Sequence, residues 1–199
     1  MAIQNIAPIV GPILPYICFA GLVRNLCMLL VLCLTAANAT AVFAAELDLA
    51  WQYAGSMNYE PRNPELGVSH KYISSAGWID VYIYSNGRCC WVAGISDPEF
   101  SAHFESIVEV LRLYAMHDVY HNLKIGAVQD VTIATQVFRT VISEYILDSQ
   151  PLISSIYLTA RNGQLLKYRI SLYATGPLDI EAVSRSFIER DLDASATTK

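Results

Sequence analysis

The clearest periodic pattern along the chain lies between Ile153 and Tyr173, in two runs rich in β-branched and aromatic residues. Asn162 and Gly163 separate the runs, and both residue types tolerate the positive φ that the central positions of a type I′ turn require. In the second run two sets alternate: Leu166, Tyr168, Ile170 and Leu172 on one side, and Lys167, Arg169, Ser171 and Tyr173 on the other. The pattern predicts a β-hairpin with one face in the core and the other in contact with water or a partner.

Similar but shorter patterns predict further strands on the N-terminal side of this hairpin. These segments are residues 47–53, 67–74, 77–85, 89–92, 123–125 and 131–147, the last of them expected to be broken. Residues 58–65 hold two prolines and are expected to form a loop.

Two segments carry helix signals. Residues 96–99, Ser-Asp-Pro-Glu, combine a capping residue, a proline and an acid, which is typical of a helix start. Apolar residues then follow at helical spacing: Phe100, Phe104, Ile107, Val108, Leu111 and Ala115. We expect this helix to end near His117. A second helix is expected to begin at residues 177–179, and residues 191–199 to form a disordered tail.

The order of these elements is strands, long helix, strands, short helix, without βαβ alternation. It predicts a single α+β domain over residues 45–190, with a mostly antiparallel sheet packed by one long and one C-terminal helix. Residues 137–145, 161–168 and 184–187 of this pattern resemble the PsbP-like family, the fold shared by an extrinsic photosystem II protein and a Ran-binding nuclear import factor. The resemblance covers residues 53–188 and implies a sandwich whose known members bind partners or assist assembly, with no catalytic set.

The first 44 residues have the composition of a signal peptide. An unbroken apolar run at residues 26–34 follows Arg24, and Val42-Phe43-Ala44 fits the small-residue rule for cleavage, with residues 37–39 as a second candidate. The long apolar stretch before Arg24 suggests a start codon placed too early, with initiation near Val23. The alternative is an uncleaved inner-membrane anchor, because residues 26–45 approach the ~20 residues needed to span a bilayer.

Charge argues against one class of partner. All 18 acidic residues lie from Glu46 onward together with 12 of the 13 basic ones, which gives this part a net charge of −6. Nucleic-acid recognition depends on basic surfaces, so we expect no nucleic-acid partner.

His117 and His121 are the weak candidates for a metal site. With Asp118 between them they resemble the H-E-x-x-H zinc motif, but Asp is one methylene shorter than Glu and the helix is expected to end there. Two surface histidines are the plainer interpretation. Cys89 and Cys90 could serve a redox, metal or intermolecular role, although buried or partly buried thiols are expected.

Four tyrosines on predicted strands, Tyr82, Tyr84, Tyr168 and Tyr173, form a possible ligand face, although aromatic strand residues usually belong to the core. Nucleophile-elbow and phosphate-loop motifs are absent from the sequence, and no cofactor is expected. The sequence therefore favours an exported, periplasmic or secreted protein that binds or assists assembly, with an unknown protein, peptide or glycan as partner. The alternative is a metal-dependent hydrolase that uses His117 and His121.

Overall fold

The computed structural model describes residues 50–63 and 65–197 of the chain. The expected signal peptide, residues 1–44, lies outside this part. Within it, no helix is both long enough and apolar enough to cross a bilayer.

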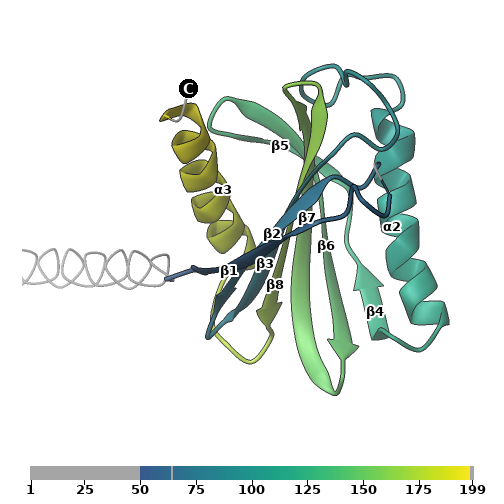
Figure 1. Ribbon diagram of the computed structural model, residues 1–199. Helices are drawn as coiled ribbons and strands as arrows, with labels where there is room; N and C mark the ends of the chain where they lie inside the picture. The colour runs from purple at the N-terminus through teal and green to yellow at the C-terminus, as the bar shows by residue number, and fades with distance from the viewer. Residues whose placement is uncertain (1–49, 64, 198–199) are drawn as a thin grey trace, which may run out of the picture. The chain divides into compact units, whose positions relative to one another are not determined.

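The described residues form a mostly antiparallel sheet and two helices, an α+β arrangement (Figure 1). In chain order the elements are β1 (Gln52–Asn58), β2 (Val68–Ser74), β3 (Gly77–Tyr84), α2 (Phe100–Met116), β4 (His121–Ile125), β5 (Gln129–Ile133), β6 (Gln136–Leu147), β7 (Gln150–Arg161), β8 (Gln164–Tyr173) and α3 (Ile180–Thr197). The predicted class is confirmed, and so is the break between β5 and β6.

The sheet joins strands that lie far apart in the sequence. Its order is β1-β2-β3-β8-β7-β6-β4, and β5 also pairs with β6. Every neighbouring pair is antiparallel, including β3 with β8 at the centre, where Gly77 lies opposite Leu172 and Tyr84 opposite Leu165. The three N-terminal strands therefore join the sheet through β8.

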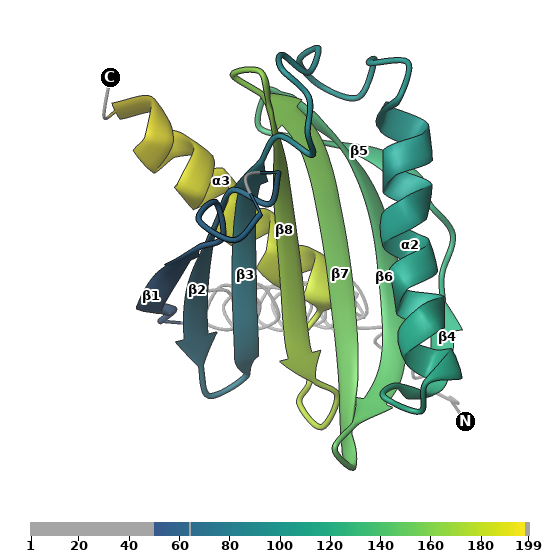
Figure 2. The ribbon, with the colours of Figure 1, turned by 45° about the vertical axis from the view of Figure 1, so that its right-hand side comes forward.

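Each face of the sheet is covered by one helix (Figure 2). Alternation along β8 sends Tyr168 and Ile170 to one face, where they pack with Val183, Phe187 and Ile188 of α3. On the other face the buried side of α2 packs against β6, β7 and the ends of β3 and β8. Its core residues are Phe100, Phe104, Val108, Leu111, Val141, Ile156, Leu158, Tyr84 and Leu165. Two apolar cores therefore lie on opposite sides of one sheet.

The β7–β8 hairpin and its turn are confirmed, but the expected wet face is not, because a core lies on each side of the sheet and β7 is buried on both faces. Asn162 and Gly163 have φ values of 54° and 77°, the positive values that a type I′ turn requires at both central positions. Arg161 pairs with Gln164 across the turn, so the register continues without a shift to Leu152 and Tyr173.

The first strand and the short segment after β3 differ from the prediction. The strand pairs Gln52 with Ile73 and Asn58 with Val68, so it runs on to Asn58 rather than ending at residue 53. Residues 89–92, expected as a strand, belong to a loop. Positive φ at Asn86, Gly87 and Cys90 interrupts the extended backbone there.

The last helix is longer than predicted. It continues from Ile180 to Thr197, through residues expected to form a disordered tail. Contacts with the sheet explain the difference: Leu192 is buried, and the Asp191 carboxylate accepts a hydrogen bond of 2.7 Å from the Tyr168 hydroxyl. The sequence of this segment is polar, but two of its side chains have partners on the sheet.

Candidate ligand-binding site

A group of aromatic and cationic side chains lies on the α2 side of β3 and β8. The register of the two strands pairs Asp80 with Arg169 and Tyr82 with Lys167. Since side chains alternate along a strand, these four residues share a face, which is the face that carries Tyr84 and Leu165. Lys167 and Arg169 are two positions apart on one strand, so their Cα atoms are separated by about 7 Å.

Part of this face is hollowed into a pocket of about 270 Å³, here called the Lys167 pocket. Its walls come from the loops after β1 and β3, from β3 itself, from α2 and from β8. The lining residues are Tyr59, Leu66, Tyr82, Tyr84, Asn86, His103, Ser106, Ile107, Val110 and Lys167. Most of this lining is apolar or aromatic, and Lys167 supplies its positive charge, which is the usual composition of a small-molecule site.

The Lys167 ammonium rests on aromatic rings rather than on an acid. Its Nζ lies 4.2 Å from the centre of the Tyr82 ring and 5.6 Å from that of Tyr84. Among the residues that the structure describes, no carboxylate lies within 4.0 Å of it. Burial, helped by the charge of Arg169, lowers the pKa of Lys167 to about 8. Cation–π contact stabilises the ammonium only in part, so an incoming anion would gain a strong charge-assisted hydrogen bond.

His103 and Tyr84 form the neutral polar part of the pocket. The Tyr84 hydroxyl and His103 Nε2 share a hydrogen bond of 2.8 Å. Burial lowers the pKa of His103 to about 4, with the charge of Lys167 acting in the same direction, so the imidazole is uncharged near pH 7. Burial also raises the pKa of Tyr82 to about 12 and that of Tyr84 further. Both phenols are therefore protonated and contribute no negative charge.

Arg169 extends the positive charge beyond the pocket. Its Nη2 donates hydrogen bonds of 2.7 Å to the Tyr120 hydroxyl and 3.0 Å to the Tyr145 hydroxyl, and these two rings stack with centroids 4.2 Å apart. Its Nε is buried and has no acceptor within the described chain. Asp80 lies opposite in register, but its ion pair, at 3.8 Å, is with Lys71. Burial raises the pKa of Asp80, while the charges of Lys71, Arg169 and Lys167 act in the opposite direction, so this acid offsets part of the local positive charge.

The structure separates the four tyrosines of the predicted ligand face. Tyr82 and Tyr84 line the Lys167 pocket. Tyr173 is on the same side of the sheet but at the far end of β8, where its ring contacts Trp78. Tyr168 is on the opposite side, fully buried against α3. Lys167, Arg169 and His103 were missed as site residues, although the alternation in β8 already assigned Lys167 and Arg169 to the face away from the core.

His117 and His121 do not share a helical face. The helix α2 ends at Met116, His117 is its C-cap, and His121 is the first residue of β4. Between them Asp118 has a φ of 55°, which is not helical. Across residues 50–63 and 65–197, no three His, Cys, Asp or Glu side chains are grouped so as to hold a metal ion. Both histidines are exposed, as the plainer interpretation expects.

Cys89 and Cys90 are bonded to each other and exposed. The expectation of buried or partly buried thiols was wrong. The strand expected at residues 89–92 would have sent the two side chains to opposite sides. Instead the loop backbone, with a φ of 72° at Cys90, brings them together.

Comparison with known proteins gives little for this chain. No family model and no curated protein matches it. Among solved structures it is similar to a protein of unknown function from Pseudomonas aeruginosa, at 13% identity and a TM-score of 0.34, over 60% of this chain and 73% of that one.

Proposed function

We propose that this protein binds a small organic anion, a carboxylate attached to an apolar or aromatic group, on the α2 side of its sheet. The observation that carries the proposal is the pair of half-buried cations, Lys167 and Arg169, neither of which has a carboxylate within 4.0 Å in the described chain. A protein with a net charge of −5 places two positive charges next to an aromatic pocket. Desolvated cations of this kind favour an anionic partner.

The shape of the pocket supports a small ligand. Its volume of about 270 Å³ is just below the usual range for ligand sites, which begins at about 300 Å³. In the proposed complex the carboxylate accepts a hydrogen bond from Lys167, and the neighbouring Arg169 guanidinium adds to the positive potential. The apolar part of the ligand then contacts Tyr59, Leu66 and Ile107.

Export and the finer fold assignment belong to the same proposal. The apolar run at residues 26–34 and the Val42-Phe43-Ala44 site support a signal peptide, hence a periplasmic or secreted protein. An antiparallel sheet with a helix on each face is compatible with the PsbP-like sandwich, whose known members bind partners or assist assembly.

A titration of the full chain with matched acid and amide pairs tests the binding proposal. The probes are phenylacetate, 4-phenylbutyrate and indole-3-acetate, each compared with its neutral amide by isothermal titration calorimetry. At least one acid is expected to bind saturably while its amide binds at least tenfold more weakly. The variant Lys167→Met keeps most of the side-chain stem and removes the charge, so it should weaken the acid by tenfold or more.

Lys124→Met is the control. Lys124 is exposed, forms an ion pair of 3.1 Å with Glu144, and does not line the Lys167 pocket. It should leave the affinity unchanged. Absence of saturable binding by all three acids, or equal affinity in wild type and Lys167→Met, would refute the proposal.

A further inference from the structure

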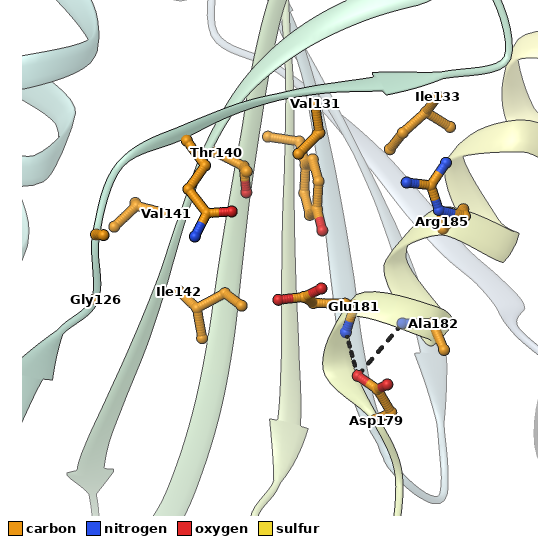
Figure 3. A pocket seen from close by; sticks show the side chains of 13 residues that line it. Gly126, Val131, Ile133, Thr140, Val141, Ile142, Asp179, Glu181, Ala182 and Arg185 are labelled. Atoms are coloured by element: carbon orange, nitrogen blue, oxygen red, sulfur yellow. Dashed lines mark hydrogen bonds between the residues drawn. The ribbon is translucent and has the colours of Figure 1, made fainter.

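A second hollow lies on the α3 side of the sheet, on the face opposite the Lys167 pocket (Figure 3). Its volume is about 460 Å³, and it is enclosed by β5, β6, β7 and the first turns of α3. Val131, Ile133 and Ile142 supply an apolar wall. Asp179, Glu181 and Arg185 stand at the α3 side. Nothing in the proposed anion site uses these residues.

The charged groups at the α3 side leave an excess of negative charge. The Arg185 guanidinium is already engaged: Nη1 donates to the Thr132 carbonyl at 3.0 Å and lies 3.8 Å from the Glu189 carboxylate. The Asp179 carboxylate accepts the backbone N–H groups of Glu181 and Ala182 at 2.9 and 3.5 Å. The Glu181 side chain makes no hydrogen bond or ion pair within the described residues.

The start of α3 would ordinarily favour an anion, because a helix N-terminus carries about half a positive charge. Here Asp179 already occupies the first N–H groups of the helix. The carboxylates of Asp179 and Glu181 together exceed the helix charge, and Arg185 is balanced by Glu189. The charge at this side of the hollow therefore selects a cation rather than an anion.

A buried hydroxyl inside the hollow points independently to a ligand. Thr140 is 7% exposed, and its Oγ1 has no hydrogen-bond partner among the described residues. Figure 3 shows Thr140 on the wall of the hollow, across from the start of α3. Beside it, burial raises the pKa of Tyr157, although the neighbouring Ser184 and Thr140 hydroxyls act in the opposite direction, so this phenol stays protonated. Buried polar groups are nearly always satisfied, so a polar group of a bound molecule can complete the hydrogen bonding of Thr140.

We propose that this hollow binds a small organic ammonium ion with a short apolar chain and a polar far end. The ammonium lies at the carboxylates of Glu181 and Asp179, and the chain follows Val131, Ile133 and Ile142. The polar end exchanges a hydrogen bond with the Thr140 hydroxyl. This second site is separate from the anion site, because the sheet itself lies between them.

The probe is 5-amino-1-pentanol, which has an ammonium, a five-carbon chain and a hydroxyl, compared with the uncharged 1,5-pentanediol. Binding to the isotopically labelled full chain is followed by NMR chemical-shift changes. The amino alcohol is expected to bind saturably, with its largest shifts at residues 126–142 and 179–185. The diol should bind at least tenfold more weakly.

Two variants test separately the contribution of the negative charge and the need for empty volume in the hollow. Glu181→Gln keeps the size of the side chain and should weaken the amino alcohol about tenfold or more. Ala182→Leu leaves all charges in place and fills the hollow, and leucine is well tolerated in helices, so it should abolish saturable shifts. Glu109→Gln, an exposed acid on α2, is the control and should bind as wild type does.

Unchanged affinity in both Glu181→Gln and Ala182→Leu would overturn the proposal, and so would the absence of saturable shifts in the wild type. Failure of this proposal can be told apart from failure of the anion site, because the anion site is tested with acids and with Lys167→Met.

Discussion

Tyr84 on β3 and His103 on α2 are joined by a hydrogen bond of 2.8 Å between the tyrosine hydroxyl and Nε2 of the imidazole. The His103 ring also lies against Trp91, with centroids 5.7 Å apart. This group connects the sheet, the loop after β3 and the helix at one end of the Lys167 pocket. These contacts bury the His103 imidazole, which disfavours its protonated form.

The burial of His103 predicts a pH dependence of stability. Its pKa is lowered to about 4 in the folded protein, against about 6.5 in an unfolded chain. Between these values the unfolded chain binds the proton more readily, so the free energy of unfolding falls as pH drops from about 6.5 to about 4. Urea unfolding of wild type and His103→Gln at pH 7 and pH 4.5 measures this contribution.

The His103→Gln variant should lose less stability than wild type between the two pH values. His117→Gln, at an exposed position, should behave as wild type does. If His103→Gln and wild type lost equal stability, another group would be responsible for the dependence.

The β7–β8 turn gives a prediction about backbone conformation. Gly163 has a φ of 77°, and a Cβ added there would meet nothing closer than the Cys90 Cα at 3.5 Å. The penalty of Gly163→Val therefore comes from φ rather than from crowding, and we expect a loss of about 1–3 kcal/mol in the free energy of unfolding. Gly176→Ala, at a glycine with open space around it, is the comparison in the same denaturant titration. A loss too small to measure would contradict the turn assignment.

How far the sequence predicts this molecule depends on whether the signal is local. The turn at Asn162-Gly163, the core face of β8 and the helix start near residue 99 depend on neighbouring residues, and all three are confirmed. The pairing of β3 with β8 is a contact between distant segments, and no local pattern encodes it.

The same distinction between local and distant contacts explains why the Lys167 pocket was not predicted from the sequence. Alternation alone placed Lys167 and Arg169 on the outer face of β8, but their aromatic neighbours come from β3 and from the residues after α2. Tyr168 was grouped with Tyr82 because both are strand tyrosines, although its position in the alternation assigns it to the core. The tail at the C-terminus was mispredicted because the partner of Asp191, Tyr168, lies on another element.

The positions of His117 and His121 predict that the protein holds no tightly bound zinc. A zinc site needs its ligands on converging side chains with a third ligand beside them, and these two residues flank the end of α2. Elemental analysis of protein purified without an affinity tag should find well under one zinc per chain. Stoichiometric zinc that disappears in His117→Ala would restore the hydrolase alternative.

The expected signal peptide predicts a processed N-terminus. Expressed with its own first 44 residues, the protein should be recovered from the periplasm with a new N-terminus at Ala45 or within a few residues of it, because Val42 and Ala44 fit the cleavage rule. N-terminal sequencing or intact-mass measurement of the periplasmic fraction provides the check. Full-length protein in the membrane fraction would favour the uncleaved anchor instead.

The pairing of β3 with β8 also sets the order in which the chain can fold. On the ribosome, residues 77–84 emerge long before their partners at residues 165–172, so β1, β2 and β3 remain without their central neighbour until nearly the whole chain has been made. Contacts between such distant segments form slowly because a large loop must close first. We therefore expect the chain to stay unfolded throughout most of its synthesis. An unfolded chain is the form that a secretion channel accepts, so under the proposed export this sheet order would leave time for transport before the centre of the sheet closes.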